Sequence, residues 1–307
     1  MSNEQNIDTN ASSMEHCFEN LILIDCGSNL ANKKYARDLD QVLKRAKDAG
    51  VQKIIVPGNS VKASKEALRL TRIYPGDIYA SAGIHPHDSK SIAEEPESWE
   101  DFEVIAANPE VVAIGPCGLD YQRDFSDPET QKEVFEKQIK LAISLRKPLL
   151  IHERAAQNDV VEILKKYSNN VMQIVIRGFI GTVEEALKYI DLGYYITLNG
   201  YLCKDKSDVG VRKLLEDGRL PLDRLIVETD SPFMYPNTRA SKLPNHVKAG
   251  LTEKSMIFLH RYCTFQRNEP CSLPATVEMI AAFMNKGAED VALATSFNAL
   301  KLFGLSQ

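Results

Sequence analysis

The sequence predicts a single-domain (β/α)8 barrel of the α/β class. The main observation is that two kinds of segment alternate along its 307 residues. Eight short runs rich in β-branched and other apolar residues are separated by segments whose apolar residues have helical spacing. The runs are continuously apolar, as expected for parallel strands covered on both faces. Eight such strands alternating with helices are typical of a closed parallel barrel. The expected strands are 21–27, 53–58, 78–84, 111–115, 148–152, 173–179, 194–200 and 225–230.

The expected helices are 34–49, 61–73, 129–146, 160–167, 183–192 and 209–215, followed by a long polar loop after Asp230 and helices near 253–262, 274–285 and 288–303. An open doubly wound sheet is the alternative fold. It favours a glycine-rich phosphate loop after the first strand, and the segment DCGSNL (25–30) is not one. We expect a disordered polar tail over 1–19 and one domain over 20–307.

Composition limits where the protein works and what it binds. The net charge of −5 excludes a surface that is basic all round, so a nucleic-acid contact must come from a local patch. The six cysteines form no CxxC pair, which favours reduced, packing cysteines. No apolar run approaches the ~20 residues of a membrane helix, and the polar N-terminus lacks the apolar core of a secretory signal. We expect a cytosolic or nuclear protein that is not secreted.

Polar side chains fall at the C-terminal ends of five expected strands, which is where a barrel of this kind carries its chemistry. A single strand-end His or Asp is more often a turn or capping residue. Convergence from five strands indicates a functional site instead. In chain order the residues are His85, His87, Cys117, Asp120, His152, Glu153, Arg154, Arg177, Glu228 and Asp230.

These segments resemble the motifs of the TatD-type metal-dependent deoxyribonucleases, a branch of the amidohydrolase-like barrels. The resemblance runs from about Leu21 to Leu305. It implies hydrolysis of DNA or RNA phosphodiesters, often from 3′ to 5′, with divalent ions activating the water. It also implies that His152 and Asp230 are metal ligands and that Asp230 is the general base. The matching motifs are AGIHPHD (82–88), VVAIGPCGLDY (111–121), LLIHER (149–154), RGFIGT (177–182), LIVETDSPF (225–233) and RNEPC (267–271).

Two positions depart from the family pattern. Pro116 stands where the family has a ligating Glu, and Arg177 stands where it has a ligating His. Proline has no side-chain donor atom and arginine is permanently protonated, so neither can hold a metal ion. Of four expected ligands, His152 and Asp230 remain. The expected cofactor is therefore a weakly bound divalent ion, Mg²⁺ or Mn²⁺ or alternatively Zn²⁺, or no cofactor at all.

The two substitutions together change the charge of the pocket by +2, which is the charge of the ion they would displace. We therefore expect Arg177 to pair with Asp230 and balance the pocket without metal. Its guanidinium also suits a phosphate, and we expect His85, His87 and Arg154 to contact phosphate as well. Glu153 and Glu228 are expected to face away from the site, because adjacent strand residues point to opposite sides.

Two functions follow as alternatives. The first is a nuclease or phosphodiesterase acting on DNA or RNA, most readily on single-stranded ends, with a depleted metal site. The second is a catalytically inactive relative that binds nucleic acid or phosphate through Arg177. Basic residues mixed with Phe233 and Tyr235 after the last strand suit single-stranded nucleic acid, although a solvated loop explains them equally well. These basic residues are Arg239, Lys242, His246 and Lys248.

Overall fold

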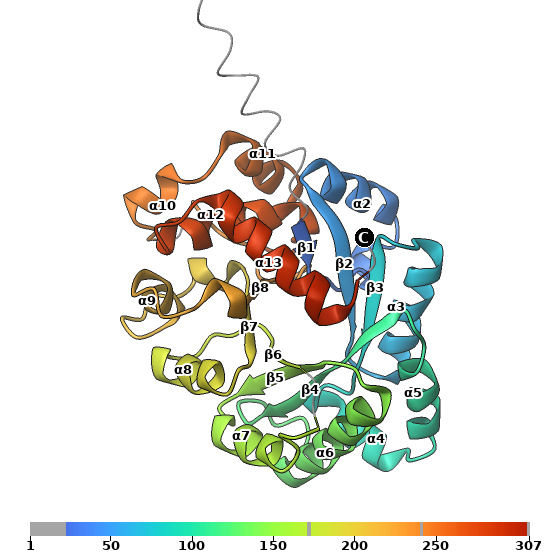
Figure 1. The fold of residues 1–307 in the computed structure, drawn as a ribbon. Helices are drawn as coiled ribbons and strands as arrows, with labels where there is room; N and C mark the ends of the chain where they lie inside the picture. The colour runs from blue at the N-terminus through green and yellow to red at the C-terminus, as the bar shows by residue number, and fades with distance from the viewer. Residues whose placement is uncertain (1–22, 171–172, 240–241, 306–307) are drawn as a thin grey trace, which may run out of the picture.

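Eight parallel strands, paired in chain order, form a nearly closed barrel in the computed structural model, which describes residues 23–170, 173–239 and 242–305 (Figure 1). The N–H of Cys26 donates to the carbonyl of Val227 at 3.1 Å and links the last strand to the first. The predicted (β/α)8 barrel is confirmed, while the predicted tail 1–19 lies outside the described residues. The strands are β1 (Leu23–Asp25), β2 (Val51–Gly58), β3 (Ile78–Ala82), β4 (Val111–Asp120), β5 (Leu149–Arg154), β6 (Ile174–Ile176), β7 (Tyr195–Leu198) and β8 (Leu225–Val227).

Helices surround the barrel and connect the strands (Figure 1). The α-helices are α2 (Leu39–Asp48), α3 (Val61–Ile73), α4 (Ser89–Glu94), α5 (Ser98–Ala106), α6 (Pro128–Leu145), α7 (Gln157–Lys165), α8 (Val183–Asp191), α9 (Val211–Glu216), α10 (Asn245–Ala249), α11 (Glu253–Tyr262), α12 (Leu273–Phe283) and α13 (Ala288–Phe303). Short 3₁₀ turns are η1 (Lys33–Tyr35), η2 (Pro86–Asp88), η3 (Gly200–Cys203), η4 (Leu222–Arg224) and η5 (Pro270–Ser272).

The sequence prediction missed α4, α5 and α10. Two of these helices, α4 and α10, have six and five residues, too few to show a repeating apolar face at 3.6 residues per turn. In α5 the buried face consists of Phe102, Ile105 and Ala106 alone. The prediction matched α3, α11 and α13 at both ends.

The inside of the barrel is a buried apolar cluster, and α13 closes one of its ends. Leu302 and Phe303 of α13 pack with residues such as Ile24 and Leu150 from inside the barrel. The amide of Asn298 donates to the carbonyls of Leu222 and Leu225 at 2.8 Å, just where β8 begins. The end at which the strands begin is therefore filled, and the end at which they finish is left for the site.

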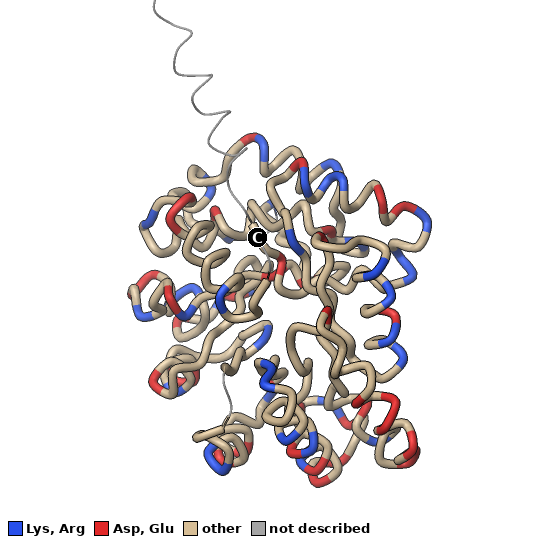
Figure 2. Tube along the Cα trace, turned by 45° about the vertical axis from the view of Figure 1, so that its right-hand side comes forward, with Lys and Arg blue, Asp and Glu red and all other residues tan. Residues whose placement is uncertain are grey.

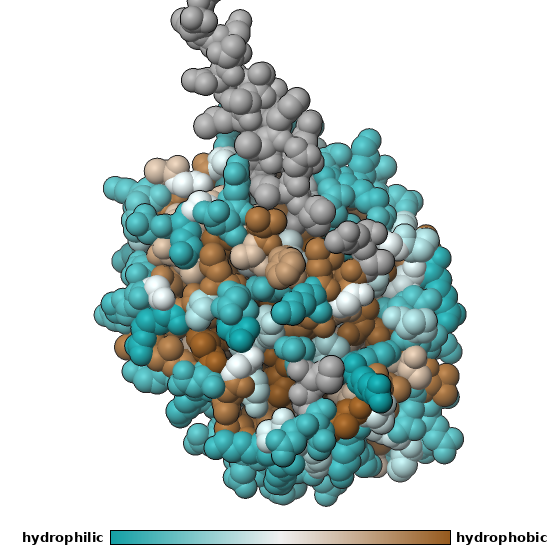
Figure 3. Space-filling model, in the orientation of Figure 1, coloured by the Kyte–Doolittle hydropathy of each residue, from teal (hydrophilic) through white to brown (hydrophobic). Residues whose placement is uncertain are grey.

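The outer surface mixes both signs of charge. Lys and Arg segments lie among Asp and Glu segments around the molecule (Figure 2), in keeping with the absence of an all-round basic surface. On the face shown in Figure 3, hydrophilic residues dominate the edge and apolar residues show nearer the middle. Within the described residues, no helix has the length and apolarity to cross a membrane. Five cysteines are buried, and Cys17 lies outside the described residues. The buried ones are Cys26, Cys117, Cys203, Cys263 and Cys271.

Candidate metal and phosphate site

Three strands bring His87, Asp120 and His152 together at the C-terminal mouth of the barrel. Oδ2 of Asp120 lies 2.7 Å from Nε2 of His87 and 3.1 Å from Nε2 of His152. The ligand atoms of the three residues lie within 4.8 Å of one another, and this is the group with metal-binding potential found in the described part of the chain. Two imidazoles and a carboxylate are suitable donors for one divalent ion.

The chain positions these three residues through local hydrogen bonds. Asp120 is the last residue of β4, and its N–H and C=O are both bonded to the side-chain amide of Gln131 from α6. His87 lies in η2, and its N–H donates to Nδ1 of His85 at 3.2 Å. The carboxylate and the first imidazole are therefore held by a backbone that is itself fixed.

Burial and hydrogen bonding give Asp120 and His152 the charge states that metal ligands need. Burial lowers the pKa of His152 to about 4, so the imidazole is neutral at pH 7. Burial alone would raise the pKa of Asp120, but hydrogen bonds with His152 and His87 hold it well below its usual range. A neutral imidazole and an ionised carboxylate are the forms that bind metal.

His85, a predicted phosphate contact, packs between the other two histidines. Its ring centroid is 4.4 Å from that of His87 and 4.3 Å from that of His152. Burial keeps the pKa of His85 well below its ordinary value, so the ring is uncharged. An uncharged, packed ring suits a role in holding its neighbours, and a phosphate contact by His85 stays a prediction.

Arg177 fills the pocket on the β6–β8 side. Its Nη2 donates to Oδ1 of Asp230 at 2.7 Å, and its Nε lies 2.9 Å from Oε2 of Glu228. The second contact is an ion pair without hydrogen-bond alignment, since neither Nε nor Oε2 has a hydrogen-bond partner among the described residues. The predicted pair of Arg177 and Asp230 is confirmed.

The guanidinium of Arg177 is fixed inside the protein rather than turned to solvent, with a side chain that is 10% exposed. Burial alone would lower its pKa, but Glu228 and Asp230 raise it above the ordinary value, so the charge is permanent. A Cβ at Gly27 would lie 2.3 Å from Oε2 of Glu228 and 2.8 Å from Nη2 of Arg177. The bare backbone of Gly27 therefore closes this side of the pocket.

The prediction that Glu228 faces away from the site is wrong. Glu228 and Asp230 both follow β8, which ends at Val227, and both side chains reach Arg177. Burial raises the pKa of Glu228 to about 7 even though Arg177 works in the other direction. Glu153 does turn away as predicted, because its carboxylate accepts from the N–H of Ala156 and the hydroxyl of Tyr189.

The two remaining predicted positions sit beside the pocket. Pro116 is buried in β4 and offers no donor atom, as the sequence indicated. Arg154 donates from Nη1 to the carbonyl of Glu153 at 2.6 Å and from Nη2 to the carbonyl of Gly178 at 2.9 Å. These bonds hold Arg154 against the backbone, and its contact with phosphate remains a prediction.

The predicted ligand pair of His152 and Asp230 is divided between two clusters. His152 belongs to the group with His87 and Asp120, whereas Asp230 is held by Arg177. Sequence reasoning placed Asp120 at a strand end without giving it a role. The sequence did contain a signal for Asp120. It ends β4, the strand between β3, which leads to His87, and β5, which carries His152.

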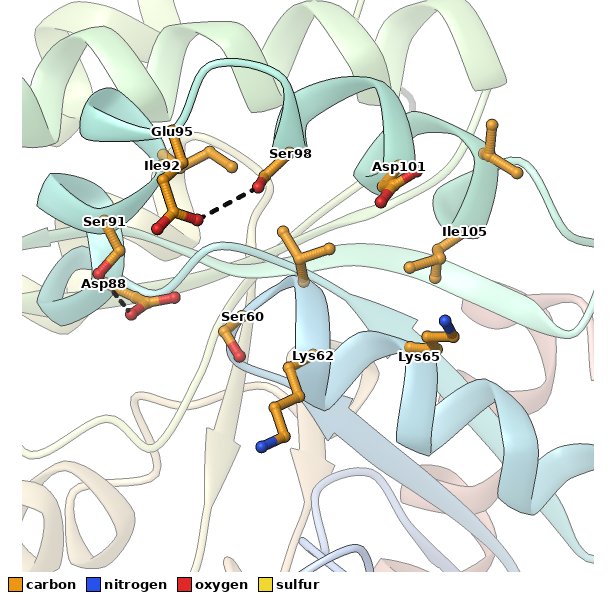
Figure 4. Close-up of a pocket in the computed structure, with 12 residues that line it drawn as sticks. Ser60, Lys62, Lys65, Asp88, Ser91, Ile92, Glu95, Ser98, Asp101 and Ile105 are labelled. Carbon is orange, nitrogen blue, oxygen red and sulfur yellow. Dashed lines mark hydrogen bonds between the residues drawn. The ribbon is translucent and has the colours of Figure 1, made fainter.

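A separate groove of about 620 Å³ lies between α3 and the pair α4–α5 (Figure 4). Lys62 and Lys65 line it from α3, and Asp88 and Glu95 line it from the other side. In Figure 4 two of these acids bond to serines of their own segment, Ser91 and Ser98. Because its charges are mixed and it contains none of the residues of the two clusters, the groove carries no chemistry that we can assign.

An eight-stranded parallel barrel with histidines and carboxylates at its strand ends is the architecture of metal-assisted hydrolases. Comparison with known proteins narrows this class. The family model of TatD related DNases matches residues 24–304, and the chain belongs to this family.

Relatives and solved structures agree with this assignment. A 3′-5′ ssDNA/RNA exonuclease TatD from Erwinia tasmaniensis is 33% identical over 283 residues, which cover 92% of this chain and 100% of that protein. The protein of the same name from Escherichia fergusonii is 34% identical over 284 residues, again 92% of this chain and 100% of that protein. The crystal structure of the TatD homolog YJJV from Escherichia coli K12 has a TM-score of 0.75 at 26% identity, covering 92% of this chain and 98% of that one. A TatD family hydrolase from Entamoeba histolytica has the same fold, with a TM-score of 0.82 at 23% identity, covering 93% and 99%.

Proposed function

We propose that this protein is a one-metal phosphodiesterase that removes nucleotides from the 3′ ends of single-stranded DNA or RNA. The observation that carries the proposal is the group of His87, Asp120 and His152, in which three donor atoms lie close together at the mouth of the barrel. The substrate class is that named for the relatives, at about one-third identity over nearly the whole chain. Buried thiols suit a reducing compartment, and we propose the cytosol or nucleus.

The family's full ligand set does not fit this pocket. Pro116 has no side-chain donor atom, and the guanidinium of Arg177 already forms an ion pair with Asp230. A single ion fits the three-residue group instead. Mg²⁺, Mn²⁺ or Zn²⁺ bound there would activate a water and offset the charge on the phosphate.

The protein's own residues divide the remaining tasks. Asp120 gathers the imidazoles of His87 and His152 at one point, because one carboxylate oxygen lies within hydrogen-bond distance of both. A bound ion would replace these hydrogen bonds and take the same three residues as ligands. Arg177 supplies a fixed positive charge beside the group and holds Asp230 in place. Asp230 is the proposed acceptor for the proton of the attacking water, and Arg154 and Arg177 are the proposed phosphate contacts, while His87 is assigned to the ion.

A specific observation favours the second candidate, a protein that binds nucleic-acid ends without cutting them. Arg177 neutralises the family's metal-binding carboxylate, and this can preserve the pocket with no ion present. In this case single-stranded nucleic acid would bind equally well with and without divalent metal.

The deciding experiment is cleavage of a 5′-labelled single-stranded DNA with Mn²⁺, with Mg²⁺ and with chelator. We expect metal-dependent shortening from the 3′ end that Asp120→Asn and His152→Ala abolish. The matched control is Asp223→Asn, because Asp223 is an exposed carboxylate on η4, where β8 begins. Binding without cleavage under all conditions would reject the hydrolase and support the second candidate.

A further inference from the structure

We propose that Phe125 is the platform on which the terminal base of the substrate stacks, and so is a specificity-determining residue of this site. The inference rests on the proposed function and deepens it. It concerns what the protein recognises next to the phosphate. The residue lies in the turn between β4 and α6, five positions after Asp120.

Phe125 presents an apolar ring to solvent directly beside the metal-type group. Phe125 is 58% exposed, so part of the ring is open to solvent. Its ring centroid lies 4.8 Å from that of His87, whose Nε2 bonds to Asp120. A nucleotide whose phosphate lies at this group would have its base within reach of the open part of the ring.

The turn that carries Phe125 is fixed at both ends. The side-chain amide of Gln131, which is buried, donates to the carbonyls of Asp120 at 3.1 Å and Ser126 at 2.8 Å. Oγ of Ser126 accepts from the N–H of Lys90 at 2.9 Å. A ring held on such a rigid turn loses little conformational entropy on binding, so stacking adds to affinity.

Stacking on an aromatic ring also suits the substrate class. Every base has a π-face, so a stacking platform accepts DNA and RNA without reading sequence. With a net charge of −5, the protein has no all-round basic surface to supply affinity, and a contact with the base compensates for this.

Phe233, which the sequence suggested as a contact for single-stranded nucleic acid, is a weaker choice for the terminal base. It is exposed, but Nζ of Lys34 already lies 5.9 Å from its ring centroid. It follows β8, four strands away from β4 in an eight-stranded barrel and thus on the opposite side of the mouth.

The test is a double-mutant cycle between protein and substrate. Binding is measured by fluorescence anisotropy with Mn²⁺, using a labelled single strand with a phosphorothioate at its terminal linkage. A second strand has the same length but lacks the 3′-terminal base. The variants are Phe125→Ala, Phe125→Trp and Phe297→Ala. Phe297 is the control, since it is 62% exposed on α13, the helix that closes the other end of the barrel.

We expect Phe125→Ala to weaken binding of the intact strand about fivefold or more, the range of base–aromatic stacking. The same variant should not weaken binding of the strand without the base, Phe125→Trp should bind like the wild type, and Phe297→Ala should change neither affinity. An equal effect of Phe125→Ala on both strands, or no effect on either, would overturn the inference and leave the proposed function standing. Failure of the wild-type protein to bind either strand would reject the proposed function, and the inference with it.

Discussion

Arg177 shows how one side chain can change the electrostatics of an inherited pocket. It stands where the resemblance to the family implies a histidine, and it contacts two carboxylates, Glu228 and Asp230. A buried cation between two anions is stable only while its partners remain, because each group was desolvated to form the cluster. The cluster is therefore a constraint on folding, because removing one member leaves a buried charge unpaired.

Arg177→Met, which keeps an unbranched apolar chain, should lower the free energy of unfolding by about 3–5 kcal/mol, as expected when one partner of a buried pair is removed. The measurement is urea unfolding at pH 8. Adding Glu228→Gln should restore part of the loss, since the uncompensated carboxylate is then gone. The control is Arg224→Met, whose ion pair with exposed Asp223 should contribute less than about 1 kcal/mol. A loss for Arg177→Met no larger than for the control would show that the cluster does not stabilise the fold.

Glu228 should make stability depend on pH. Burial raises its pKa from 4.5 to about 7, so between these values the folded protein holds a proton that the unfolded chain releases. The stability contributed by this proton is complete below pH 4.5 and is lost as the pH rises through 7. Relative to Glu228→Gln, the wild type should lose on the order of 2 kcal/mol between pH 5 and pH 8, at about 1.4 kcal/mol per pKa unit. Parallel stability curves for the two proteins over this interval would refute the assignment.

Among the elements, α13 closes the end of the barrel at which the strands begin, and the site lies at the opposite end. Its last turn inserts Leu302 and Phe303 into the apolar cluster inside the strands, and Asn298 bonds to the carbonyls where β8 begins. The interior is thus filled at the end where the strands begin, and the polar groups of the site lie at the other end of this apolar cluster. The sequence predicted this helix from end to end, because its sixteen residues contain no glycine or proline and its buried positions recur at helical spacing.

Leu302→Ala should destabilise the protein by about 2–5 kcal/mol, because it leaves a cavity in the closed end of the barrel. Leu293→Ala is the matched control on the same helix, since Leu293 is 69% exposed, and its effect should stay within about 0.5 kcal/mol. Thermal or urea unfolding measures both. If the two variants proved equally stable, α13 would not be the closure of the barrel.

For the whole molecule, the pattern of strands could be predicted from sequence, but the grouping of side chains could not. Each predicted strand overlaps an observed one, because buried parallel strands leave continuous apolar runs in the chain. The pairing of Arg177 with Asp230 also followed from charge alone. The role of Asp120 did not, since it depends on which histidines the barrel places across from it. The orientation of Glu228 was predicted wrongly because Glu228 was treated as a strand residue next to one that faces the site. It lies two positions before Asp230, beyond the end of β8.

Replacing Pro116 and Arg177 by the two residues that the family resemblance implies tests how the site arose. Pro116→Glu combined with Arg177→His returns two donors and releases Asp230 from its ion pair. We expect the double variant to bind more Mn²⁺ per chain than the wild type and to cut single-stranded DNA faster, whereas each single variant gains less. If the wild type does not cut and the double variant does, the protein is a former nuclease that now binds. No gain in metal would mean that the pocket has changed beyond these two positions.

The most direct test of the account is a Mn²⁺ titration followed by electron paramagnetic resonance, with the wild type, Asp120→Asn and Asp230→Asn compared side by side. A single ion should bind with His87, Asp120 and His152, because Asp230 already pairs with Arg177. We therefore expect one bound ion in the wild type, none in Asp120→Asn, and one in Asp230→Asn. An ion that survives Asp120→Asn but is lost in Asp230→Asn, or a wild type that binds none, would contradict it.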